Sequence, residues 1–199
     1  MPKYSVSVRA GGAFPTGDFA DFYGTGFMGK LGFAYKINPV TDIYISAGNT
    51  LWKIDNNDVN KKLRKENIDA EVNLDSELQN IPVTVGVKLS TGSRRYKIYT
   101  GLAIVLNFLN LKTAGEITSD NQTETISPDE ESFTKTSLAI EMGVIIPLSR
   151  KLELDIGGKY NAISDFDNNI IPQIGPVSDP VRAGTARYFS ILAGINYIF

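Results

Sequence analysis

The 199-residue chain contains no cysteine and no histidine. Without cysteine it forms no disulfide and offers no thiolate as a metal ligand or nucleophile. Without histidine it lacks the usual zinc ligands, the commonest general base and the Ser–His pair of many hydrolases. Its 20 basic and 22 acidic residues leave no cationic excess for nucleic acid. We therefore expect a non-enzymatic protein with no catalytic residues, no cofactor, no metal site and no nucleic-acid partner.

Long hydrophobic runs are missing as well. The longest extends from Leu102 to Leu106, whereas a helix needs about 18 apolar residues to span a bilayer. The N-terminus lacks the apolar stretch of about 7–15 residues that marks a signal peptide. We expect either a cytoplasmic chain or, as we prefer, the mature form of a secreted one with an initiator methionine added. The length predicts a single domain over residues 1–199.

What the sequence does contain is apolar residues at every second position, the period of a β-strand. Several of these segments are ten or more residues long, whereas ordinary strands have about 5–6. There are eight segments, over residues 4–10, 27–37, 43–47, 81–89, 96–108, 138–146, 152–160 and 189–199.

The connections between these segments alternate in length. Turn-like links at 38–41, 91–94 and 148–151 alternate with long polar segments at 15–26, 55–79, 110–134 and 164–186. In an up-and-down meander, all short turns and both termini then lie at one end, and all long loops at the other. Val72 and Leu74 alternate in the opposite phase to Ile81 and its successors. We therefore expect a strand extension above the main sheet, with a bulge or break near Gln79 and Asn80, and a short helix as an alternative in that loop.

The polar face of the strands indicates which side meets the membrane. Many of its residues are small, as the narrow lumen of an eight-stranded barrel requires: Gly32, Ala34, Gly86, Gly101, Ala103, Gly143, Gly157 and Gly194. Aromatic residues gather toward strand ends, as at a membrane boundary: Tyr35, Trp52, Tyr96, Tyr160, Tyr197 and Phe199. We therefore predict a transmembrane barrel with its apolar face in lipid. A soluble lipocalin-like carrier, with that face turned inward, is the alternative.

Charged residues on the same polar face predict an ion network inside the lumen. If two strands fold about the turn at 148–151, Glu141 and Lys159 lie opposite each other, and Arg9 and Lys30 lie at a comparable height. We predict a Glu141–Lys159 ion pair, because a buried charge without a partner is costly. A gated ion path or proton relay is the functional alternative. Lys88 and Lys97 are expected to face each other at the wet rim.

Two other motifs favour ordinary structure over ligand binding. Gly24 to Gly29 matches the G-x-G-x-x-G pattern of dinucleotide sites, but an alternating strand follows instead of the required helix. The segment at 110–134 carries several acidic residues and a single lysine, Lys112. It lacks the spacing of a calcium loop, so we predict a solvated acidic loop. Its acidic residues are Glu116, Asp120, Glu124, Asp129, Glu130 and Glu131.

The last eleven residues, 189–199, alternate up to a terminal aromatic and resemble the C-terminal strand of bacterial outer-membrane β-barrels. Residues 81–88 and 11–19 are similar to the small OmpA/OmpX-like "outer membrane protein beta-barrel" or porin-family group, in the style of Bacteroidota. The resemblance covers the whole chain. It implies an all-β, eight-stranded antiparallel up-and-down transmembrane β-barrel with short periplasmic turns and long extracellular loops.

The same resemblance implies a place and partners. It implies that the protein is a monomer in the bacterial outer membrane, in contact with lipid and lipopolysaccharide. Tyr197 and Phe199 would form the assembly signal that the barrel-assembly machinery reads. We expect a structural or surface-interaction role carried by the long loops. The alternatives are a small passive channel, a soluble carrier of an apolar ligand, and an outer-membrane enzyme, which the lack of histidine disfavours.

Overall fold

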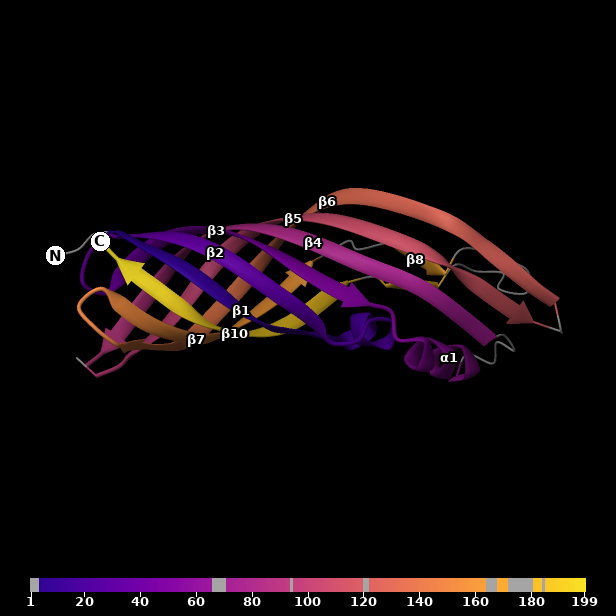
Figure 1. Ribbon diagram of the computed structural model, residues 1–199, viewed down its shortest axis with the longest axis horizontal. Coiled ribbons are helices and arrows are strands. Elements are labelled where there is room, and N and C mark those ends of the chain that lie inside the picture. The colour runs from indigo at the N-terminus through magenta and orange to yellow at the C-terminus, as the bar shows by residue number, and fades with distance from the viewer. Residues whose placement is uncertain are drawn as a thin grey trace.

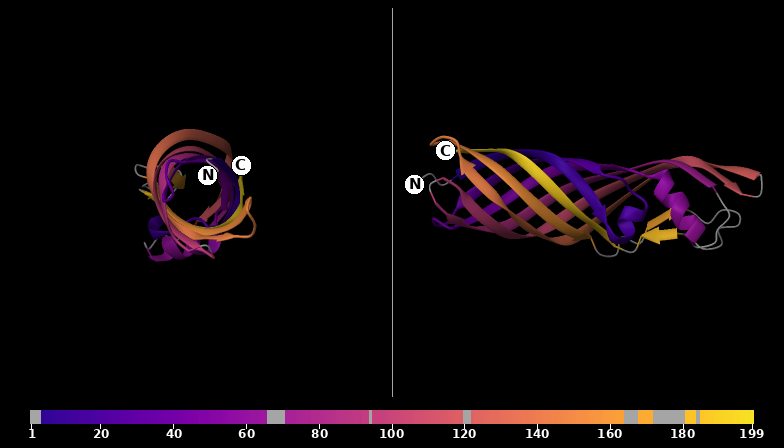
Figure 2. Two further views of the ribbon diagram at one scale, coloured as in Figure 1. Left: turned by 90° about the vertical axis from the view of Figure 1, so that its left-hand side faces the viewer. Right: turned by 90° about the horizontal axis from the view of Figure 1, so that it is seen from below.

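The computed structural model describes residues 4–65, 71–93, 95–119, 122–163, 168–171, 181–183 and 185–199. Eight antiparallel strands close into a barrel in the order β1-β10-β7-β6-β5-β4-β3-β2 (Figures 1 and 2). These strands are β1 (Tyr4–Thr16), β2 (Gly26–Lys36), β3 (Thr41–Lys53), β4 (Glu71–Gly92), β5 (Lys97–Ser119), β6 (Gln122–Pro147), β7 (Leu152–Ile163) and β10 (Ala186–Ile198).

Closure is made by the first and last strands, as the sequence predicts. β1 and β10 pair from Ser5 opposite Ile198 to Thr16 opposite Arg187. The backbone N–H of Phe199 continues this ladder by donating to the Tyr4 carbonyl (3.0 Å). Both termini therefore lie at the end that carries the short turns, seen at the left of Figure 1. The predicted eight-stranded antiparallel barrel is confirmed.

The apolar face of the strands points outward over the middle of the barrel. Leu102 is 68% exposed and Leu138 is 72% exposed, whereas their strand neighbours Ala103 and Ala139 are buried. A belt this apolar is stable against lipid but not against water, so the barrel is a membrane-spanning one. The soluble-carrier alternative is wrong, because it needs these side chains inside. Across the described residues, no helix has the length and apolar character to span a membrane.

Aromatic side chains mark both rims of the apolar belt. At the short-turn end Tyr4 packs on Phe33 and Tyr35, and Tyr197 packs on Phe199. At the other end an outward row runs through Phe14, Phe189 and Tyr160, which are partners across adjacent strands. Such rings favour the boundary between lipid and water.

Trp52, which we expected among the boundary aromatics, lies inside the barrel. It is 1% exposed, and its indole Nε1 donates to the Ala13 carbonyl at 3.3 Å. The reason is strand parity: Ile43, Ile45 and Leu51 face outward on β3, so an even-numbered residue faces inward.

Beyond the membrane, β4, β5 and β6 continue as a three-stranded extension, which we call the arm (residues 71–79, 109–119 and 122–136). It projects from the barrel at the right of Figure 1. The predicted loop at 110–134 is thus largely strand, because ladder hydrogen bonds do not require lipid and its many threonines favour β-structure. Asp120 lies outside the described residues.

The bulge expected near Gln79 and Asn80 is absent from β4, which keeps one register against β5 from Glu71 to Gly92. The phase change has another cause. Above the membrane the inward positions of β4, held by Val72, Leu74 and Leu78, are buried by apolar neighbours rather than by polar lumen side chains. The register shift lies instead in the arm, where β5 changes its pairing with β6 between Thr113 and Gly115.

Helix α1 (Asn56–Lys65) covers part of the arm and confirms the alternative of a short helix. Asn56 and Asn60 lie one turn apart on it. The side-chain amide of each forms two hydrogen bonds with the backbone of β4, as a neighbouring strand would. Asn56 accepts from the Leu74 N–H (2.9 Å) and donates to its carbonyl (3.0 Å). Asn60 does the same at Val72 (2.8 and 2.9 Å). The outer edge of β4 is therefore satisfied, and its tendency to pair with another chain is suppressed.

The remaining elements belong to the long connections. The 3-10 helix η1 (Gly17–Asp21) follows β1, and the short strands β8 (Asn168–Ile171) and β9 (Val181–Ala183) pair within the last long connection. All of them lie at the end opposite the termini (Figure 2). The rest of the predicted loop at 164–186 lies largely outside the described residues.

Candidate functional site

A cluster of buried hydrophobic side chains, which we call the plug, closes the barrel at the end that carries the long loops. Phe19 and Phe22 of η1 and its border, Trp52 of β3, Tyr188 of β10 and Leu63 of α1 all belong to one buried cluster. The Trp52 ring packs edge-on against Phe19 (5.4 Å between centroids) and Tyr188 (5.0 Å). Burial in the plug also raises the pKa of the nearby Tyr23 hydroxyl above its ordinary value, which keeps it neutral.

The plug leads to a prediction about conductance. Planar-bilayer recordings of the purified protein should show no large, steady open channel, because close-packed apolar side chains leave no path for hydrated ions. A stable conductance of porin size would contradict this and would support the passive-channel alternative.

Beneath the plug, a chain of amide and hydroxyl groups crosses five strands. Asn80 donates to Asn107 (3.0 Å), Asn107 to Ser137 (2.8 Å), Ser137 to Asn161 (2.8 Å), and Asn161 to Tyr188 (2.9 Å). Because each member is buried and hydrogen-bonded to the next, this layer fixes the strands around the lumen. The sequence analysis missed it, although the inward parity of Asn107 and Asn161 is readable from their apolar neighbours.

Below this polar layer lies a cluster of buried charges. All four residues predicted for the lumen network, Arg9, Lys30, Glu141 and Lys159, are inside the barrel and at most 9% exposed. Lys30 Nζ lies 3.0 Å from Glu141 Oε1, and an Arg9 guanidinium nitrogen lies 2.9 Å from Asp155 Oδ2. The Tyr99 hydroxyl also donates to Asp155 (2.9 Å). Asp155 is therefore a second anionic centre of the cluster, one that the predicted set of four does not contain.

The predicted ion pair between Glu141 and Lys159 is not formed. The two residues are opposite each other in the register of β6 and β7, as predicted. Glu141 nevertheless pairs across the lumen with Lys30, and Lys159 Nζ donates to the Thr84 hydroxyl at 3.2 Å. The lumen is narrow and lysine is long, so side chains from non-adjacent strands meet.

The position of Lys88 differs from the prediction that it faces Lys97 at the wet rim. It pairs in register with Gly101 rather than Lys97, and it is buried rather than at the rim. Its ammonium lies 4.0 Å from the centre of the Tyr99 ring and 5.5 Å from that of Tyr44, an arrangement that stabilises a buried cation. Its carboxylate neighbour is Asp155, at 3.7 Å.

Glycines make room for these aromatic rings. A side-chain carbon built at Gly143 or Gly157 would collide with the Tyr99 ring, and one at Gly86 would collide with Tyr44. This explains why small residues share the polar face with large charged ones, as the sequence pattern indicates.

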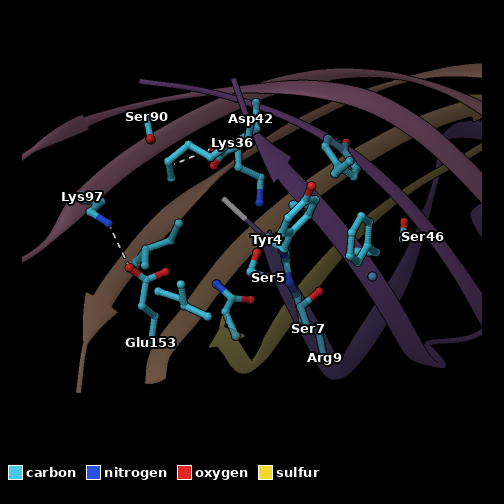
Figure 3. A pocket seen from close by; sticks show the side chains of 18 of the residues that line it. Tyr4, Ser5, Ser7, Arg9, Lys36, Asp42, Ser46, Ser90, Lys97 and Glu153 are labelled. Carbon is cyan, nitrogen blue, oxygen red and sulfur yellow. Dashed lines mark hydrogen bonds and ion pairs between the residues drawn. The ribbon is translucent and has the colours of Figure 1, made fainter. Parts of the chain in front are cut away.

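Toward the short-turn end the interior opens into a cavity of about 280 Å³ (Figure 3). Arg9, Tyr44, Ser46 and Lys88 line its inner part. At its mouth Lys36 pairs with Asp42 (2.8 Å) and Lys97 pairs with Glu153 (2.9 Å). The interior of the barrel is therefore closed by the plug at the end that carries the long loops, and open at the end that carries the short turns.

The predicted assembly residues lie on the outer surface of the turn end. Tyr197 and Phe199 face outward and contact each other, with ring centroids 5.0 Å apart. Their role in assembly stays a prediction. Among the described residues, no three acidic side chains are grouped so as to hold a metal ion.

Searches by sequence find neither a matching protein-family model nor a matching curated protein. Solved structures do match over the whole barrel. Neisserial surface protein A is 18% identical, with 98% of this chain and 97% of that chain covered and a TM-score of 0.57. Ail of Yersinia pestis, the attachment invasion locus protein in complex with the heparin analogue sucrose octasulfate, is 15% identical over both full chains (TM-score 0.54).

A third match is the outer-membrane protease OmpT of Escherichia coli, 9% identical with 99% and 97% of the chains covered (TM-score 0.53). At such identities these structures speak for the fold and not for an activity. Together with the outward apolar belt, the two aromatic rims and the closed antiparallel ladder, they show that this chain has the transmembrane β-barrel fold of outer-membrane proteins.

Proposed function

We propose that this protein is a non-enzymatic surface protein of a bacterial outer membrane whose arm binds a partner outside the cell. The observation that supports this is the free edge of β6. From Gln122 to Thr136, β6 pairs with β5 but with no second strand among the described residues, because its pairing with β7 begins at Ser137. Unpaired backbone N–H and C=O groups are a template for strand addition.

The nature of the edge favours a particular partner. The register shift opposite Gly115 interrupts the outer part of the edge, so the stretch from Asp129 to Thr136 is the longest regular one. Asp129, Glu130 and Glu131 are exposed there, with Lys112 at 3.8 Å from Glu130 and Lys135 further along the same stretch. An extended segment with basic side chains fits this edge best.

The contrast with β4 supports the same conclusion. On β4 the side chains of Asn56 and Asn60 satisfy the edge of the arm, whereas before Ser137 no described strand pairs with the outer edge of β6. Within the described residues, one edge of the arm is thus protected, and the other is not paired with a further strand. The names of two proteins with the same fold refer to a surface protein and to attachment, which agrees with a surface role.

The surroundings follow from the barrel itself. The apolar belt would contact outer-membrane lipid, and lipopolysaccharide would surround the outer rim. One chain closes the ladder, so we propose a monomer, assembled by the barrel-assembly machinery. The protease fold relative does not change the proposal, because this chain has no histidine.

A photo-crosslinking experiment on intact cells tests the arm. A crosslinking residue at Thr134, on the free edge, should capture one discrete basic partner. The same residue at Thr91, near the end of β4 beside a short turn at the opposite end of the barrel, should not. Changing Asp129, Glu130 and Glu131 to serine should weaken capture at Thr134, because the partner is expected to be basic.

The result that would contradict the proposal is equal capture at both positions, or capture at Thr134 that is indifferent to the acidic residues. Heat-modifiable migration in gels shows whether each variant is folded. Soluble basic peptides of alternating pattern should compete with the crosslink, whereas acidic peptides of the same pattern should not.

A further inference from the structure

The buried charges of the lumen do not balance. Glu153 is neutralised at the cavity mouth by Lys97. The other buried ionic side chains in the described part of the chain are four cations and two carboxylates: Arg9, Lys30, Lys88 and Lys159, with Glu141 and Asp155. Asp155 is shared between Arg9 (2.9 Å) and Lys88 (3.7 Å). An excess of buried cation is unfavourable unless a counter-charge is supplied or a lysine loses its proton.

Hydrogen-bond donors without partners border the same space. Arg9 Nε, the Tyr44 hydroxyl and the Ser46 hydroxyl have no hydrogen-bond partner among the described residues. These side chains are 9%, 9% and 4% exposed, and all three line the cavity that opens at the turn end. Figure 3 shows Arg9 and Ser46 among the lining side chains. A guanidinium N–H only donates, so the missing partner of Arg9 has to accept, and both hydroxyls are able to donate to the same acceptor.

The cavity mouth is neutral while its floor is cationic. Lys36 with Asp42 and Lys97 with Glu153 are complete ion pairs at the entrance. The unbalanced charge is therefore at depth, beside Arg9 and Lys88. At roughly 30 Å³ per water molecule, 280 Å³ holds several waters, or one small anion with part of its hydration shell.

From the charge excess, the orphan donors and the one-sided opening, we propose that the lumen is a binding site for a small oxyanion, entered from the turn end. Arg9 and Lys88 supply the charge, and the Tyr44 and Ser46 hydroxyls supply hydrogen bonds. The unpartnered Asn196 Oδ1, which lines the same cavity, accepts from a water or from a protonated ligand oxygen. Because short turns are periplasmic in barrels of this type, the anion comes from the periplasm and not from the cell exterior.

Inorganic phosphate is the probe for this site. Folded protein in detergent is titrated with phosphate by calorimetry, with chloride keeping the ionic strength constant. The expected result is saturable binding at one site per barrel. Lys88→Met should weaken the affinity at least tenfold. Lys151→Met should change it less than threefold, because that lysine is exposed in a turn at the same end and is not among the residues that line the cavity.

Ser46→Ala provides a second variant if Lys88→Met does not fold, since it removes one neutral donor. It should weaken phosphate binding several-fold while heat-modifiable migration stays normal. Sulfate in place of phosphate should also bind, because the site recognises an oxyanion rather than phosphorus. Absence of saturable binding by the wild type would overturn the proposal and leave water as the occupant. Equal losses in Lys88→Met and Lys151→Met would overturn it too, because binding would not then depend on the floor of the cavity.

Discussion

Replacing Glu141 by glutamine should lower the free energy of unfolding by about 3 kcal/mol, the lower end of the range for breaking one side of a buried ion pair. Glu141 is 3% exposed, and its carboxylate lies 3.0 Å from Lys30. Without it, Asp155 alone faces the four cations of the cluster. The measurement is urea unfolding of the protein in lipid vesicles, followed by the fluorescence of Trp52 in the plug.

A double-mutant cycle shows which partner matters. Glu141→Gln combined with Lys30→Met should cost clearly less than the sum of the two single variants, because the pair is removed together. Combination with Lys159→Met should show weaker coupling, since Lys159 donates to Thr84. Asp42→Asn, in the half-buried pair at the mouth, is the matched control and should cost less than about 1 kcal/mol. Additivity of the Lys30 and Glu141 variants would contradict the observed pairing.

Deletion of Phe199, or Phe199→Ala, should reduce the amount of folded barrel in the outer membrane several-fold. The resemblance of the last strand to an assembly signal motivates this prediction. In addition, the Phe199 N–H makes the final bond of the closing ladder, and its ring packs on Tyr197. Membrane yield and heat-modifiable migration measure the outcome.

Phe189→Ala is the matched control for the terminal residue. Phe189 is on the same strand and the same outward face, but at the opposite rim. It should leave assembly near normal, because a signal at the end of the chain does not include it. Normal yield of the Phe199 variants, or an equal loss in Phe189→Ala, would contradict a role for the terminus.

Most of the barrel fold is predictable from strand parity, the alternation of outward and inward side chains along each strand. Alternation assigns Leu102 to lipid and Ala103 to the lumen, and with the alternating loop lengths it yields the eight strands, their order and the β1–β10 closure. The position of Trp52 was wrong only because its aromatic character was weighed above its parity. An unbroken count from Ile43 places it inside.

Other features were not readable from the pattern. The β4 part of the arm is predicted as a strand extension, but its β5 and β6 parts are predicted as a polar loop, because strands outside the membrane lose the apolar alternation that marks them inside. The pairing of Glu141 with Lys30 was missed for a different reason. Register specifies which backbone positions are opposite on neighbouring strands, but it does not specify which long side chains meet across a closed lumen.

The orientation of the two faces is the central claim, and quenching of tryptophan by brominated lipid tests it most directly. The chain has one tryptophan, Trp52, buried in the plug. In vesicles of lipid brominated in the acyl chains, the native protein should show little quenching. Leu102→Trp in a Trp52→Phe background should be strongly quenched, because position 102 faces outward from the middle of β5. Strong quenching of native Trp52 together with no quenching at position 102 would contradict the assignment of the apolar face to lipid.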